Sequence, residues 1–178
     1  MSIHPVTQLR RYDERFQALP RTLPAGDANA GTYWRGIAFR IGQTQLTASM
    51  EQVSEVLTDP LVSRVPGAKP WVRGLANVRG RLVTIVDLPL FLNLERASTS
   101  RGMRALFVES GDLSVGLLVD QVHGARQFVN DERHEDSGDI ADALRPYVSG
   151  RMTSTTESWA VLDIGRILAD PTFLSAAA

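Results

Sequence analysis

The stretch GLANVRGRLVTIVDL, from Gly74 to Leu88, places a polar corner between two apolar runs. The corner holds Asn77, Arg79 and Gly80, and asparagine and glycine tolerate the positive φ angles of tight hairpin turns. The run from Leu82 to Val86 is apolar at four of five positions, which predicts a strand covered on both faces. The stretch therefore predicts a β-hairpin whose corner is a candidate contact surface.

Short predicted strands flank this hairpin. Upstream, Ile37, Phe39 and Ile41 alternate with smaller or polar residues, which is typical of a half-buried strand. Apolar and β-branched residues continue through 46–56, and DPLVSRVPGAKP at 59–70 is a proline-bounded loop. Short strands with closely spaced turn signals favour an all-β fold of small barrels or a sandwich.

The second half of the chain repeats the first. DLPLFL from Asp87 is matched by DIGRIL from Asp163, 76 positions later. A second set recurs 69 positions later: Gly42, Leu46, Met50, Glu51, Gln52 and Val53 are matched by Gly111, Val115, Val119, Asp120, Gln121 and Val122. Two strand-rich lobes of similar build would produce this pattern, and a chance likeness between β-strands is the alternative.

Length and composition fit one compact domain or two small lobes. The chain has 178 residues, 43% of them hydrophobic, and a formal net charge of −1. It contains no cysteine, which excludes disulfides, thiolate zinc sites and cysteine nucleophiles. No apolar run approaches the roughly 20 residues that span a bilayer, and the N-terminus lacks a signal-peptide core. We therefore expect a cytoplasmic protein.

The N-terminal residues 1–33 lie ahead of the first predicted strand. Apolar residues recur there at spacings of three and four, namely Val6, Leu9, Tyr12, Phe16 and Leu19. This spacing predicts one amphipathic helix, and the proline- and glycine-containing segment that follows it is a linker. The helix either docks on the body of the protein or binds a partner.

Groups that could perform catalysis do not form a recognisable motif. His4, His123 and His134 lack the spacing of metal ligands. Asp87 and Asp163 each stand where an apolar strand ends, which favours helix capping over a catalytic carboxylate pair. The sequence predicts no cofactor, no metal and no enzymatic activity, and an enzyme with an unrecognised site is one alternative.

A small β-barrel module that binds nucleic acid is the other alternative. Such modules interleave aromatic side chains with basic ones along a strand face. Here aromatics make up 7% of the chain, Lys69 is its only lysine, and the cluster of Arg73, Arg79 and Arg81 is sparse. We therefore expect no nucleic-acid binding, and a steep loss of affinity with salt would contradict this expectation.

The hairpin stretch resembles the signature of CheW-like domains, with its glycine, its Asn-aliphatic-Arg-Gly turn and its aliphatic strand ending in Asp-Leu. Other motifs fall in the family's order along the chain: QVSEV at 52–56, VGLLVDQV at 115–122 and YVSG at 147–150. The resemblance covers roughly 34–168, and Thr84 stands where the family usually has proline. The segments WRGIAFR and WVRGLANVRG are most similar to the branch that serves type IV pilus, or twitching, chemosensory systems.

This resemblance implies a fold and a role. The fold would be two small five-stranded SH3-like β-barrel lobes with a few short helices, in a domain at 34–168 between the N-terminal 1–33 and a C-terminal tail at 169–178. The role would be that of a non-enzymatic adaptor, coupling the cytoplasmic tips of methyl-accepting chemoreceptors to the regulatory domain of a CheA-type histidine kinase. The adaptor would be recruited to membrane-associated receptor arrays that control twitching. An adaptor that modulates another adaptor of the same family fits the sequence equally well.

The resemblance also implies a set of receptor- or kinase-binding residues: Val53, Glu55, Val56, Gly74, Asn77, Arg79, Gly80, Gly116 and Gly150. Val53 and Val56 would line an apolar groove between the lobes that seats an amphipathic helix. Arg79 would pair with Glu55, and its planar guanidinium would also shape the receptor surface. Gly74, Gly116 and Gly150 each have an alternative explanation, a bulge or a turn that needs positive φ.

Overall fold

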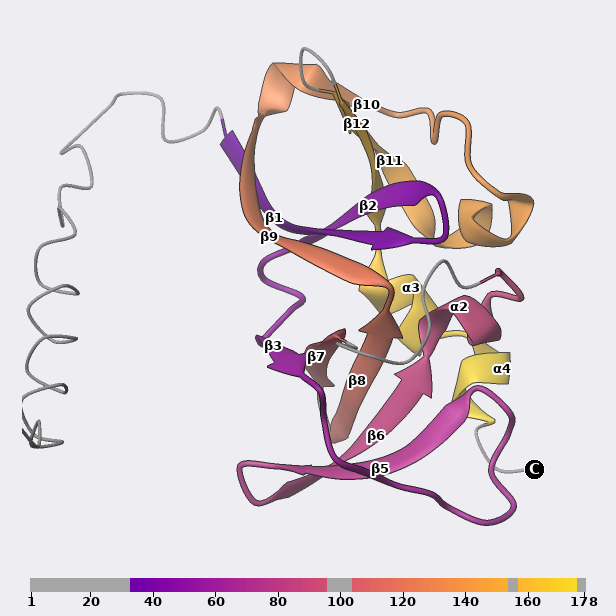
Figure 1. Cartoon of the computed structure of the whole chain (residues 1–178). Coiled ribbons are helices and arrows are strands. Elements are labelled where there is room, and N and C mark those ends of the chain that lie inside the picture. The colour runs from indigo at the N-terminus through magenta and orange to yellow at the C-terminus, as the bar shows by residue number, and fades with distance from the viewer. Residues whose placement is uncertain (1–32, 96–103, 154–156, 176–178) are drawn as a thin grey trace, which may run out of the picture. The chain divides into compact units, whose positions relative to one another are not determined.

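The structure is a computed structural model that describes residues 33–95, 104–153 and 157–175, all within one compact unit, Thr32–Ala178. The predicted N-terminal helix lies outside these residues. Two curled sheets form two lobes (Figure 1), which confirms the all-β prediction. None of the helices in the described ranges is long and apolar enough to cross a membrane.

Lobe 1 is a six-stranded sheet in the order β10-β11-β12-β2-β1-β9. Its strands are β1 (Tyr33–Ile41), β2 (Thr44–Ser49), β9 (Gln121–Val129), β10 (Arg133–His134), β11 (Val148–Thr153) and β12 (Ser158–Leu162). The helices that follow or interrupt it are η1 (Asn130–Glu132), η2 (Asp142–Tyr147), α3 (Ile164–Leu168) and α4 (Pro171–Leu174).

Lobe 2 is a six-stranded sheet in the order β3-β7-β8-β6-β5-β4. Its strands are β3 (Glu55–Thr58), β4 (Val62–Ser63), β5 (Val72–Val78), β6 (Arg81–Asp87), β7 (Arg104–Ser110) and β8 (Leu113–Val119), and α2 (Leu88–Phe91) follows β6. Five strands were expected in each lobe. The sixth is a two-residue strand, β10 in lobe 1 and β4 in lobe 2, and β4 lies inside the expected loop at 59–70.

The two halves of the chain exchange strands between the lobes. The first half places β1 and β2 in lobe 1 and β3 to β6 in lobe 2, whereas the second half places β7 and β8 in lobe 2 and β9 to β12 in lobe 1. Each lobe is joined across the halves by one parallel strand pair, β6 with β8 and β12 with β2. Neither half can therefore complete a lobe by itself.

The strand registers confirm the sequence repeat. In lobe 2 Thr84 pairs with Val115, and in lobe 1 Ala160 pairs with Leu46. Ala160 stands 76 positions after Thr84, and Val115 stands 69 positions after Leu46, which are the two offsets found in the sequence. The repeat thus relates the parallel pair β6–β8 of lobe 2 to the parallel pair β12–β2 of lobe 1.

The two helix caps repeat as well. The Asp87 side chain accepts from the backbone N–H of Leu90 at the start of α2, and the Asp163 side chain accepts from that of Gly165 at the start of α3. Both aspartates are N-caps, as predicted. Asp163 also accepts a hydrogen bond of 2.9 Å from the side-chain amide of Gln52, which lies in the connection from lobe 1 to lobe 2.

A shared hydrophobic core joins the lobes. It contains Phe39 and Leu46 from lobe 1 and Leu106 and Leu117 from lobe 2, all with 0% exposure. β1 was expected to be half-buried, but Ala38 on its opposite face is also fully buried, in the interior of lobe 1. The prediction was wrong because one face of β1 packs on the other lobe while the other face lines its own barrel.

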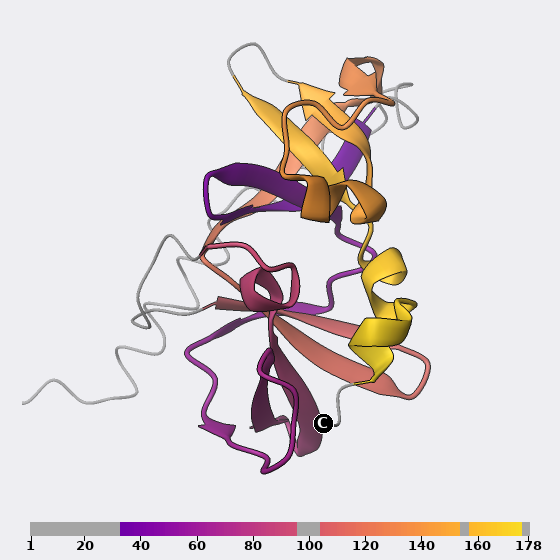
Figure 2. The ribbon, with the colours of Figure 1, turned by 90° about the vertical axis from the view of Figure 1, so that its right-hand side faces the viewer.

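Two short C-terminal helices, α3 and α4, lie alongside lobe 2 (Figure 2). The expected C-terminal tail at 169–178 thus begins with structure: Asp170 caps α4, and Phe173 is buried against Phe91, with ring centroids 5.2 Å apart. The Tyr147 hydroxyl donates to Asp170 Oδ2 at 2.7 Å. One hydrogen bond therefore ties η2 of lobe 1 to the helix that covers the core.

This hydrogen bond predicts a dependence of stability on pH. Burial, and then the bond to Asp170, raise the pKa of Tyr147 from 10.0 to about 12. Because the folded-state pKa is the higher one, the proton on Tyr147 stabilises the fold below pH 10, and this contribution is lost as pH rises towards 12. We expect Tyr147→Phe to flatten the fall in unfolding free energy over this range, measured by urea unfolding.

Tyr33→Phe is the matched control, because Tyr33 is half-exposed at the start of β1 and makes none of these contacts. It should leave the alkaline slope unchanged. Equal slopes in wild type and Tyr147→Phe would show that folding does not raise the pKa of Tyr147.

Candidate functional site

The corner of the central hairpin is a tight turn held by its own side chains. Val78 pairs with Arg81, so Arg79 and Gly80 form a two-residue loop. Their φ angles are 53° and 83°, and positive φ at both positions is the mark of a type I′ hairpin turn. The Gly80 N–H donates to Asn77 Oδ1 at 2.8 Å. The predicted hairpin is confirmed, and Asn77 fixes the shape of its tip.

Two ion pairs anchor this tip to the rest of lobe 2. Arg79 Nη2 lies 3.0 Å from Glu55 Oε1 at the start of β3, as the resemblance implied. Arg81 Nη1 pairs with Glu109 Oε1 on β7, a contact that the sequence did not predict. The Arg79 side chain is 79% exposed, so the pair orients the guanidinium without withdrawing it from solvent.

Leu82 departs from the expectation that its strand is covered on both faces. It is 71% exposed, at the end of β6 where the pairing with β8, which is recorded from Thr84 onward, has not yet begun. Leu82 stands opposite Asn77, and residues that face each other across a strand pair point to the same side of the sheet. An apolar side chain thus lies beside the polar turn. The sequence indicates this exposure only by the position of Leu82 close after the turn.

Four of the expected contact residues are buried. Val53 is 9% exposed and belongs to the core between the lobes, and Gly74, Gly116 and Gly150 are buried within the sheets. Val56 is half-buried against the same core. The exposed members of the set are therefore Asn77, Arg79 and Gly80, together with part of Glu55.

Gly74 and Gly150 occupy equivalent bulges in the two lobes. Their φ angles are 140° and 145°, and the register of each strand pair shifts at these positions. A Cβ on Gly74 would lie 2.0 Å from the carbonyl oxygen of Ser63, and one on Gly150 would lie 2.4 Å from that of His134. These glycines allow β4 and β10 to approach the neighbouring strand, which explains them without a partner.

We expect Gly74→Ala to lower the free energy of unfolding by about 3 kcal/mol, because the new methyl group meets backbone that cannot rotate away. Gly67→Ala is the control. Gly67 has a φ of 73°, and no atom lies within 4 Å of the place that its methyl group would take, so strain alone should cost about 1 kcal/mol. Urea unfolding measures both, and equal losses would contradict the steric explanation.

The Arg79–Glu55 pair should contribute little to stability. One partner is largely solvent-exposed, and exposed pairs typically yield coupling energies of about 0 to 1 kcal/mol. A double-mutant cycle of Arg79→Ala and Glu55→Ala, followed by urea unfolding, measures the coupling directly. A coupling energy above about 2 kcal/mol would show that the pair is part of the stabilising framework.

Other surface features offer fewer groups that could bind a partner or a metal ion. Lobe 1 has an open pocket of about 580 Å³ between the ends of β2 and β12 and the loop at 137–141, lined mainly by polar side chains. Within the described ranges, histidine and acidic side chains do not gather in threes that could hold a metal ion. The hairpin tip, with its exposed guanidinium, carboxylate, amide and leucine, is suited to binding another surface.

The comparison with protein families gives the identity. Residues 35–172 match the CheW-like domain. The chain belongs to this family. It is 40% identical to Protein PilI of Pseudomonas aeruginosa over 146 residues, which is 82% of each chain. It is 25% identical to Chemotaxis protein CheW of Thermotoga maritima over 76% of this chain and 88% of that one.

A solved structure agrees with the fold. The crystal structure of scaffolding protein TtCheW from Thermoanaerobacter tengcongensis matches with a TM-score of 0.64 and 19% identity, covering 72% of this chain and 88% of that one. The CheW-like fold expected from the hairpin signature is thereby confirmed, as is the similarity to the type IV pilus branch.

Proposed function

We propose that this CheW-like protein is a non-enzymatic adaptor that couples the cytoplasmic tips of methyl-accepting chemoreceptors to the regulatory domain of a CheA-type histidine kinase. The observation that carries the proposal is the match of 35–172 to the CheW-like domain. The 40% identity to Protein PilI supports a chemosensory system for type IV pilus twitching. The protein would act in the cytoplasm, recruited to membrane-associated receptor arrays.

The hairpin tip is the surface we assign to partner binding. Its guanidinium is held by Glu55 but remains open to solvent, so it can form bidentate hydrogen bonds with an acidic partner group. Leu82, 71% exposed beside it, supplies apolar area that a partner would remove from water. Arginine is enriched at protein–protein interfaces and among the residues that contribute most to binding.

The buried members of the expected set have a supporting role in this proposal. Gly74 and Gly116 lie in the sheet that carries the tip, Val53 lies in the core between the lobes and Gly150 lies in lobe 1. We propose direct contacts for Glu55, Asn77, Arg79 and Gly80. The domain division at 33/34 and 168/169 is kept as part of the proposal, with α3 inside the domain and α4 beyond it.

The test is titration calorimetry of the full chain against the isolated regulatory domain of a CheA-type kinase and against a chemoreceptor-tip fragment, both from the same organism. Saturable binding to both is expected. Binding to neither would remove the coupling role while leaving the family assignment intact.

Arg79→Glu should weaken at least one of these interactions about tenfold or more, because it reverses a charge at the binding surface. The fold should persist, since the replaced ion pair is exposed. Arg133→Glu is the matched control, an exposed arginine on β10 of lobe 1. Unchanged affinity of folded Arg79→Glu for both partners would contradict the assignment of the tip.

A further inference from the structure

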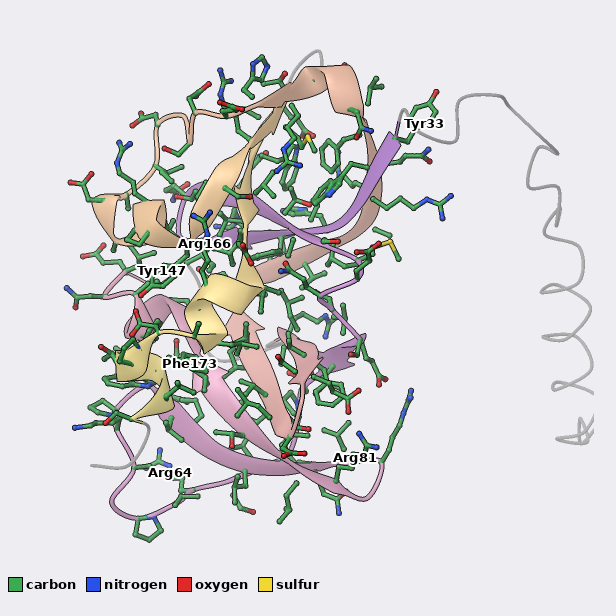
Figure 3. All side chains as sticks on the ribbon, turned by 180° about the vertical axis from the view of Figure 1, so that it is seen from behind. Tyr33, Arg64, Arg81, Tyr147, Arg166 and Phe173 are labelled. Atoms are coloured by element: carbon green, nitrogen blue, oxygen red, sulfur yellow. The ribbon has the colours of Figure 1, made fainter. Side chains whose placement is uncertain are left out.

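A basic pocket lies in lobe 2 between the loop at 64–70 and the start of β5. It has a volume of about 240 Å³ and is lined by Arg64, Val65, Ala68, Lys69, Pro70, Val72 and Arg73. Three of these seven residues are cationic and none is acidic. Figure 3 shows Arg64 on the opposite side of lobe 2 from Arg81, so the pocket is separate from the hairpin tip.

The walls of this pocket are set by the fold. Pro66 and Pro70 restrict the loop, and Gly67 turns it with a φ of 73°. The Val72 N–H donates to the Lys69 carbonyl at 2.9 Å, which closes the turn into β5. The cationic side chains therefore project from backbone that is ordered before any ligand arrives, which lowers the entropic cost of binding.

Two of the three positive charges have no acidic group beside them in the described part of the chain. Arg73 forms an ion pair with the buried carboxylate of Asp87, with 3.8 Å between Arg73 Nη1 and Asp87 Oδ2. Among the residues that the structure describes, Arg64 and Lys69 have no acidic group within 4.0 Å. Three cations around one small volume repel each other, and an anion between them would convert this repulsion into attraction.

We propose that this pocket binds a phosphate dianion, either free inorganic phosphate or the phosphate group of a small phosphorylated molecule. Arginine presents a planar fork of N–H donors that matches phosphate oxygens, and lysine adds a compact charge. Val65, Ala68 and Pro70 line the same pocket and offer apolar contacts for a small organic group attached to the phosphate. The inference does not depend on the adaptor role proposed above.

The test is an NMR titration of the full chain, at constant ionic strength, with inorganic phosphate and separately with glycerol phosphate. Backbone amides of the loop at 64–70 and the start of β5 should shift and saturate with at least one of the two probes. Tighter binding of glycerol phosphate would identify a phosphorylated small molecule as the source, and equal or tighter binding of inorganic phosphate would identify free phosphate.

Single substitutions locate the site. Arg64→Gln and Lys69→Gln should each weaken binding roughly tenfold, since each removes a charge-assisted hydrogen bond. Lys69→Arg should retain most of the affinity, and Arg133→Gln, an exposed cation in lobe 1, should leave it unchanged. Thermal unfolding of each variant confirms that it is folded.

Two results would overturn the proposal. The first is the absence of saturable shifts around the pocket at tens of millimolar of either probe, roughly the weakest affinity that a specific site would show. The second is an equal loss of phosphate affinity in Arg133→Gln and Lys69→Gln, which would mean that phosphate is attracted only by the general positive charge of the surface.

Discussion

The exchange of strands between the two halves of the chain is the constraint on which the rest of the structure depends. The parallel pair β6–β8 in lobe 2 and the equivalent pair β12–β2 in lobe 1 each join strands from different halves, so each lobe is incomplete without both halves. The exchange also requires the chain to pass twice between the lobes, and the core that includes Phe39 and Leu106 fills the space between them. The two lobes thus share one hydrophobic core and stabilise each other.

This arrangement separates the residues that hold the fold from those that face solvent. Gly74 and Gly150 let short edge strands approach their neighbours, and Val53 is buried where the chain crosses from one lobe to the other. The side chains of Asn77 and Arg79 at the exposed tip do not pack in the core, so they are available to contact a partner. A rigid frame below the tip reduces the conformational entropy lost when a partner binds.

Much of the fold was predictable because the sequence repeat shows that the two lobes have the same arrangement of strands. The two offsets in the sequence correspond to the pairing of Thr84 with Val115 and of Ala160 with Leu46, and the caps at Asp87 and Asp163 followed from strand ends. The exposure of Leu82 was not predictable, since it depends on where the neighbouring strand β8 begins to pair. The basic pocket was not predictable either, because Arg64 and Lys69 come together with Arg73 only when the loop at 64–70 folds against the start of β5.

The order in which the strands are made has a consequence for the newly synthesised protein. All strands of lobe 2 lie between Glu55 and Val119, whereas lobe 1 needs Leu46 of β2 to meet Ala160 of β12. On a ribosome, the strands of lobe 2 are complete while those of lobe 1 still await their last partner, and domains generally fold as their segments emerge. Until β12 is released, β2 has one open edge, and such an edge is a site for aggregation or for chaperone binding.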